Sequence, residues 1–202
     1  MMSIRKASRR SPWISLRSSL HLALLVLTLA ITPLVAAAED DASTYDQQSI
    51  IKDATEFFGE TTEGLAKVIE KAFKDHGRPT GYVKGEEIAG AVALGLRYGD
   101  GILTLKDGTT ARVYWQGPSL GFDLGANASK VFILVYGMPN ADEIYQRFPA
   151  VDGSLYYVAG AGINYQQWKH VVLAPIRLGV GWRAGASIGY THYTRVKTLN
   201  PL

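Results

Sequence analysis

The 202-residue sequence contains no cysteine, and this absence excludes several kinds of chemistry at once. It rules out disulfide bonds, thiolate metal sites, cysteine nucleophiles and a lipid-modified N-terminal cysteine. Nucleotide signatures are missing too, because the chain has no G-x-x-x-x-G-K-[ST] loop and no G-x-G-x-x-G between a strand and a helix. We therefore expect no cofactor and no nucleotide partner, and we expect packing alone to stabilise the fold.

Acidic residues are absent from residues 1–38, which carry five basic ones. The whole chain has a formal charge of +3, so the rest of the chain, taken without this segment, is slightly acidic. The high isoelectric point of the whole chain is therefore due to the basic residues of segment 1–38, and it gives no reason to expect a nucleic-acid partner. The histidines of the remaining chain lack the short spacings typical of metal ligands, so we expect no metal.

Residues 1–38 have the three-part pattern of a secretory signal peptide. A basic region over 1–19 precedes an apolar run over 22–31, and three small residues at 36–38 stand before Glu39. The apolar run is shorter than the roughly 20 residues that span a bilayer, which favours cleavage over a retained anchor. We expect an exported, periplasmic protein with a linker over 39–45.

Residues 46–79 predict two amphipathic helices. Thr44 and Gln47 fit a capping box in front of a first helix over 45–58, whose apolar residues recur at helical spacing. A second helix follows and ends where Gly77 and Pro79 provide stop signals.

Residues 80–202 read as a β-barrel domain. Short β-rich runs alternate with turn signals at 98–101, 106–109, 116–118, 125–127 and 152–153, and many glycines follow after residue 154. The 106–109 signal predicts a hairpin, and Asn140 would cap a helical insert over 140–148. The predicted fold is mainly β, a small antiparallel β-barrel or strongly curved sheet with two N-terminal helices and one short helical insert.

The candidate binding site lies in the stretch 113–123, where aromatic side chains surround a Gly/Pro turn. One interpretation is a rim that holds a sugar or a lipid headgroup; the other is a barrel corner whose aromatics belong to the core. Arg177 is a candidate contact for phosphate or carboxylate, against the alternative of a solvated outward position. The candidate residues are Tyr114, Trp115, Gln116, Ser119, Phe122, Asp123 and Arg177.

Catalytic motifs are weak in this sequence. Residues 117–121 match G-x-S-x-G, but a strand rather than a helix is expected after Ser119, which favours a turn residue over a nucleophile. Glu86 and Glu87 are adjacent, so on a strand they point to opposite faces and cannot share one cleft. We therefore expect a protein that is not an enzyme, with a periplasmic hydrolase as the alternative.

Several stretches resemble the EipA-type envelope integrity proteins of alphaproteobacteria. The resemblance runs from about Ser49 to Pro201 and is strongest over 114–123, Tyr-Trp-Gln-Gly-Pro-Ser-Leu-Gly-Phe-Asp; stretches 95–101, 148–154 and 173–177 also carry it. It implies a periplasmic protein with a small β-barrel and a role in maintaining the envelope. It supplies no catalytic residues.

A weaker similarity to SYLF lipid-binding domains rests on 120–125, the apolar strand 131–135 and the late glycine-rich strands. It implies lipid binding at 114–125. Together these patterns predict a periplasmic protein that contributes to envelope integrity by binding an envelope lipid, glycan or protein. The sequence does not set the oligomeric state.

Overall fold

The computed structural model describes residues 42–90, 94–120, 128–179 and 189–198. The chain divides into two compact units, Met1–Glu39 and Asp40–Leu202, and all described residues belong to the second. Within these ranges no helix is both long and apolar enough to cross a bilayer.

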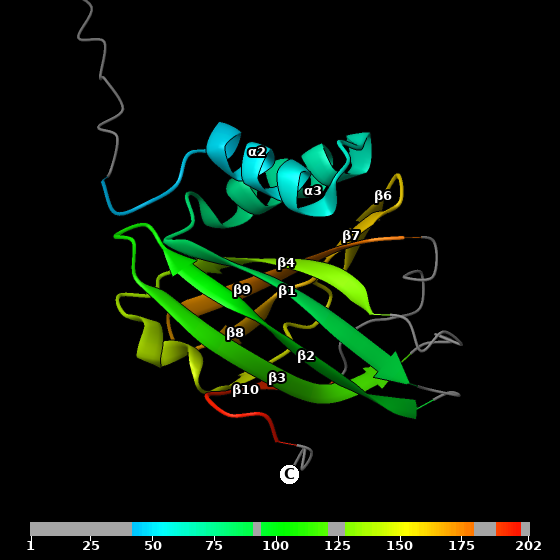
Figure 1. Ribbon diagram of the computed structural model, residues 1–202. Helices are drawn as coiled ribbons and strands as arrows, with labels where there is room; N and C mark the ends of the chain where they lie inside the picture. The colour runs from blue at the N-terminus through cyan, green and yellow to red at the C-terminus, as the bar shows by residue number, and fades with distance from the viewer. Residues whose placement is uncertain (1–41, 91–93, 121–127, 180–188, 199–202) are drawn as a thin grey trace, which may run out of the picture. The chain divides into compact units, whose positions relative to one another are not determined.

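Two α-helices, a 3₁₀ helix and ten strands make up the described part of this unit (Figure 1). The helices are α2 (Gln47–Phe58), α3 (Glu63–His76) and the 3₁₀ helix η1 (Ala141–Ile144). The longer strands are β1 (Gly81–Gly90), β2 (Leu94–Leu105), β3 (Thr110–Leu120), β4 (Ser129–Tyr136) and β9 (Val171–Leu178). The shorter strands are β5 (Arg147–Pro149), β6 (Tyr156–Val158), β7 (Ala161–Ile163), β8 (Gln166–Trp168) and β10 (Tyr190–Thr194).

All strand pairs of the sheet are antiparallel, in the order β5-β10-β3-β2-β1-β4-β9-β7-β6, with β8 also paired to β9. The sheet curls until its two sides meet. There Ala150 bridges to Gln166, and the amide of Val151 donates to the carbonyl of Tyr165. The prediction of a small antiparallel barrel or strongly curved sheet with two N-terminal helices and a short insert is confirmed.

Strand register sorts the side chains into two sets. At odd-numbered positions of β1, β2 and β3, Val83, Leu103, Val113 and Trp115 point into the barrel and form part of an apolar core with residues of β4 and β9. The even-numbered residues next to them point outward. Which outward residues are buried depends on the helices.

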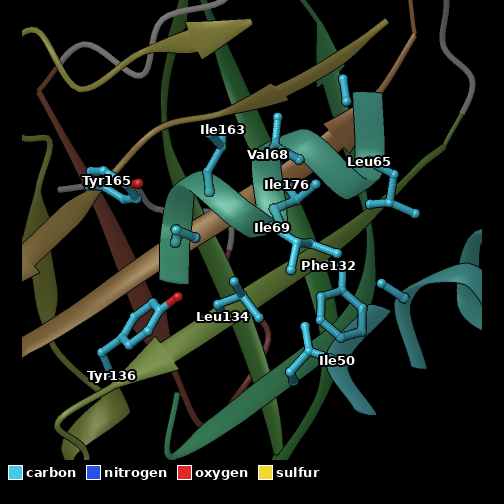
Figure 2. Close-up of a cluster of buried hydrophobic side chains, with 14 of the residues drawn as sticks. Ile50, Leu65, Val68, Ile69, Phe132, Leu134, Tyr136, Ile163, Tyr165 and Ile176 are labelled. Atoms are coloured by element: carbon cyan, nitrogen blue, oxygen red, sulfur yellow. The ribbon is translucent and has the colours of Figure 1, made fainter. Parts of the chain in front are cut away.

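The helices cover only part of the outer surface. Helix α2 packs on β4, and α3 packs on β6, β7 and β9, whereas β2, β3 and β10 lie away from both (Figure 1). Figure 2 shows the resulting core, in which Ile50 and Ile69 from the helices meet Phe132, Leu134 and Ile176 from the sheet.

The helix boundaries follow local signals with one correction. The predicted capping box of Thr44 and Gln47 is wrong, because the N-cap of α2 is Asp46, whose carboxylate accepts from the amide of Ser49. An ionised carboxylate two residues later is the stronger acceptor for the free amides of the first turn. The predicted stop of α3 at Gly77 is confirmed, with φ at 75°.

The insert after Asn140 is shorter than predicted. Asn140 caps it, as expected, but only Ala141–Ile144 is helical, in the 3₁₀ form. Residues 147–149 instead form β5, because pairing with β10 satisfies their backbone groups. The predicted hairpin at 106–109 is confirmed, with Gly108 at φ 89° between β2 and β3.

Two predicted turns are wrong. Residues 98–101 lie within β2, and residues 116–118 lie within β3, in register with their neighbours. The glycines there serve packing rather than turning, since a Cβ on Gly99 would overlap the ring of Trp115 and one on Gly85 would lie 2.6 Å from it. Glycine inside these strands makes room for a large interior side chain.

Candidate functional site

The outward side chains that the helices leave uncovered form a surface that we call the open face, which comprises Glu86, Ile88, Leu96, Tyr98, Asp100, Tyr114, Gln116, Pro118, His192 and Thr194. Register aligns these residues in rows across the strands. One row runs Glu86, Asp100, Tyr114 and Thr194, and the next runs Ile88, Tyr98, Gln116 and His192.

A shallow cavity of about 120 Å³ lies between these two rows. Tyr98, Tyr114 and Ile88 supply ring and apolar surface, and Trp115 is also among the lining residues. The polar groups around it come from Glu86, Asp100, Gln116, Thr194, Lys197 and Thr198. A concave site with apolar surface and a few converging polar groups is the usual form of a small-molecule site.

The two carboxylates of the cavity stand in an unfavourable arrangement. Glu86 and Asp100 are directly opposite each other on β1 and β2, where like charges destabilise a sheet. Asp100 is balanced by an ion pair with Arg112, whose guanidinium also lies over the Tyr114 ring at 5.5 Å. Glu86 has no hydrogen-bond or ion-pair partner among the described residues, because Lys130, opposite it on β4, donates to the carbonyl of Phe57 instead.

A second polar cluster lies inside the barrel, on the other side of the same strands. Glu87 accepts from Arg177, whose Nη2 lies 3.0 Å from Oε2, and Arg97 Nε lies 3.5 Å from Oε1. The indole of Trp115 donates to Glu87 at 3.4 Å, and Arg177 also donates to Asn164. Next to this cluster, Gln166 is held by hydrogen bonds with Thr191 and Tyr193.

Burial and charge oppose each other at Glu87. Burial by itself would raise the pKa of this carboxyl group, but the charges of Arg177 and Arg97 more than offset it and lower the pKa to about 2. Glu87 is therefore ionised at neutral pH and bound on several sides. The interior cluster ties β1, β2 and β9 together and leaves Glu87 committed to its structural partners.

The structure divides the sequence-predicted site between these two sides of the sheet. Tyr114 and Gln116 point outward from β3 and line the cavity, with the Gln116 side chain only 2% exposed, whereas Trp115 and Arg177 point inward and are 3% exposed. Arg177 does meet a carboxylate, that of Glu87, and the alternative of a solvated outward position is wrong for it. Trp115 is a core residue that is also among the residues lining the cavity.

The remaining candidates are placed in part or not at all. Ser119 lies in β3 opposite Gly95, so it stands in a strand rather than at a turn or a strand-to-helix elbow. Phe122 and Asp123 lie outside the described residues. The rim proposed over 113–123 is thus represented in the described part by three lining residues of the cavity, Tyr114, Trp115 and Gln116.

The sequence reasoning missed most residues of the cavity and of the interior cluster, among them the following four. Tyr98 and Asp100 sit in a segment predicted as a turn, and Glu86 and Glu87 were considered only as a possible pair. The available signal was alternation: once 94–105 is one strand, even residues share a face with Tyr114 and odd residues share the interior with Trp115. The register between β1 and β2 had no signal in either strand alone.

Comparison with known proteins agrees with this fold. Residues 43–202 match the family model described as Envelope integrity protein A, EipA. A solved crystal structure of a β-barrel-like, uncharacterised protein from Brucella abortus is similar, with 42% identity and a TM-score of 0.73. The match covers 79% of this chain and 99% of that one. No curated protein matches the chain. Neither of the two matches indicates a catalytic family, and the chain belongs to the envelope integrity protein A family.

Proposed function

We propose that this protein is exported to the periplasm and contributes to envelope integrity by binding an envelope component at the open face, without catalysis. The family supports the envelope role. The single observation that supports binding is the cavity between Glu86, Asp100, Tyr98 and Tyr114 on a face that the helices leave uncovered.

The unpaired Glu86 strengthens this proposal. A carboxylate opposite another carboxylate, with no partner among the described residues, reduces the stability of the sheet, and no contact of its side chain offsets this loss. Local features that work against stability are expected at functional sites. The buried Glu87 is the contrasting case, since its partners explain its presence structurally.

Lipid binding of the SYLF kind is the alternative function. It would require an apolar channel for an acyl chain or a basic surface for an anionic headgroup. The cavity on the open face is small and carries two carboxylates, and the basic side chains of the interior cluster are bound to Glu87. These observations favour a polar ligand.

A deletion strain of the bacterium that encodes this chain tests the role. We expect sensitivity to detergent and its rescue by the full-length wild-type gene. A gene with Tyr98→Ala and Glu86→Gln should not rescue. A gene with Tyr156→Ala and Glu70→Gln, from a similar aromatic and charged cavity beside α3, should rescue fully.

Cell fractionation and immunoblotting complete the test. The expected result is a periplasmic protein of equal abundance in the wild-type and both variant strains. Normal detergent tolerance of the deletion strain would refute the envelope role. Rescue by the open-face variant would refute the role of this face.

A further inference from the structure

We infer that the open-face cavity binds one uncharged saccharide unit, an inference that rests on the proposed function and names its ligand class. The cavity combines ring surface, opposed carboxylates and nearly balanced charge. Each of these features excludes a different kind of ligand, and together they match the chemistry of a sugar ring.

On β1 and β2, the apolar side chains at the cavity lie one row away from the carboxylates. Ile88 and Tyr98 face each other across β1 and β2 in one row, and Glu86 and Asp100 face each other in the next. Rows on one face of a sheet are about 7 Å apart along the strand. A pyranose ring has the same division, because its C–H faces are apolar and its edge carries hydroxyl groups.

The carboxylates suit hydroxyl donors. An ionised carboxylate only accepts hydrogen bonds, and a sugar hydroxyl donates one while accepting another. Hydroxyl groups placed between Glu86 and Asp100 would satisfy acceptors that now repel each other. Gln116 and Thr194 line the same cavity, and the hydroxyl of Thr194, which donates to the carbonyl of Val196 at 2.8 Å, keeps its capacity to accept a hydrogen bond.

Preorganisation at the cavity also favours a rigid ligand. The Arg112 guanidinium pairs with Asp100 and lies over the ring of Tyr114, so it holds both groups in place. The carbonyl of Arg112 in turn accepts from Tyr145 at 3.0 Å. Groups that are fixed before binding lose less entropy when a ligand arrives.

Charge at the cavity selects against anionic ligands. Arg112 pairs with Asp100 and Lys197 lines the cavity, so two basic groups stand against the two carboxylates and leave no excess positive charge to attract an anion. A phosphate would meet the unpaired carboxylate of Glu86. An acyl chain would place hydrocarbon against charged groups in a cavity of only about 120 Å³.

The test uses residues 40–202, which form one compact unit and contain the whole family match over 43–202. Chitotetraose and maltotetraose are titrated as uncharged saccharides, with inorganic phosphate and phosphatidylethanolamine–phosphatidylglycerol vesicles as the competing ligand classes. Chemical-shift changes in two-dimensional NMR spectra report the affected residues.

We expect at least one saccharide to shift the amide signals of residues 86–88, 98–100 and 114–116. Tyr98→Ala and Glu86→Gln should each weaken the affinity by about tenfold or more. Tyr156→Ala and Glu70→Gln, at the cavity beside α3, should leave it unchanged. Unchanged signals of the buried Leu103 and Ile133 would show that the variants fold.

Two results would overturn the inference: no shift with either saccharide, or vesicle or phosphate binding that the open-face variants abolish. The outcome in cells separates this inference from the proposed function. If the open-face variant fails to rescue and the protein binds no saccharide, the proposed function stands and only the ligand class is wrong. If the protein binds saccharide and the open-face variant rescues fully, the saccharide site stands but the face has no role in envelope integrity.

Discussion

Strand β1 places four side chains on the outer surface, and the two halves of the strand differ in what meets them. Tyr82 stacks on Phe132 with ring centroids 5.2 Å apart, and Lys84 pairs with Asp53 of α2 at 3.1 Å. In the second half of the strand, Glu86 has no partner among the described residues, and Ile88 is 50% exposed. The same alternation thus builds a core under the helices and an uncovered surface beyond them.

The largest loss of stability should come from a substitution in the half of the sheet that the helices cover. Phe132→Ala removes a fully buried ring between α2 and the sheet. We expect it to lower the free energy of unfolding by about 3–5 kcal/mol, because of lost transfer energy and the cavity left behind. Urea denaturation followed by circular dichroism measures it. A loss below 1 kcal/mol would mean that the helices contribute little to this half.

A substitution in the interior cluster around Glu87 should destabilise the protein almost as much. Glu87→Gln leaves the buried guanidinium groups of Arg97 and Arg177 facing a neutral amide. We expect a loss of about 3 kcal/mol, since removing one member of a buried ion pair strands the other charge. The matched change Glu86→Gln on the open face should cost nothing measurable or stabilise slightly. Equal losses for the two variants would contradict the assignment of inward and outward positions.

Low pH should destabilise the folded protein through the same cluster. The pKa of Glu87 is lowered from 4.5 to about 2, so the folded protein holds this proton more weakly than the unfolded chain. The contribution to stability is therefore complete above about pH 4.5 and is lost as the pH falls toward 2. Denaturation midpoints at several pH values should show this loss, and Glu87→Gln should flatten the curve. An unchanged slope in the variant would assign the acid sensitivity to other groups.

Packing at the glycine positions predicts a smaller loss. Gly99→Ala adds a Cβ that overlaps the indole of Trp115. We expect about 1–3 kcal/mol of destabilisation from overpacking, whereas Gly153→Ala, at an exposed turn, tests only the strain of its positive φ. Thermal unfolding of both variants provides the measurement. No change for Gly99→Ala would mean that Trp115 can move away from β2.

The smallest stability effect should come from the open face. Ile88→Ala changes a half-exposed side chain at the cavity and should alter the free energy of unfolding by less than about 0.5 kcal/mol. The same variant should weaken saccharide binding in the NMR titration. Destabilisation comparable to that of Phe132→Ala would show that Ile88 is part of a core, and the contrast between the halves would fail.

Local sequence signals were sufficient for the helices and the hairpin. Apolar spacing predicted α2 and α3, Gly77 marked the end of α3, and Gly108 marked the turn between β2 and β3. These features depend on neighbours within a few residues. The same kind of signal failed at 98–101, because glycines that make room for Trp115 look identical to glycines that turn the chain.

The candidate site was predictable only in part, for a related reason. Tyr114 and Gln116 belong to the cavity, but alternation carries Trp115 to the other face, and Arg177 joins it there from a strand 62 positions later in the sequence. Glu87 and Arg177 meet because β1, β4 and β9 are neighbours in the sheet. No pattern within either segment specifies that order.

By itself the sequence determined the two N-terminal helices with their apolar faces and the hairpin at 106–109, because these depend on spacing and turn residues within one segment. Tertiary structure alone decided which outward residues are covered, which charges are paired and which carboxylates face each other. Those outcomes depend on strand order, register and the placement of two helices over one half of the barrel, and each joins residues that are distant in the chain.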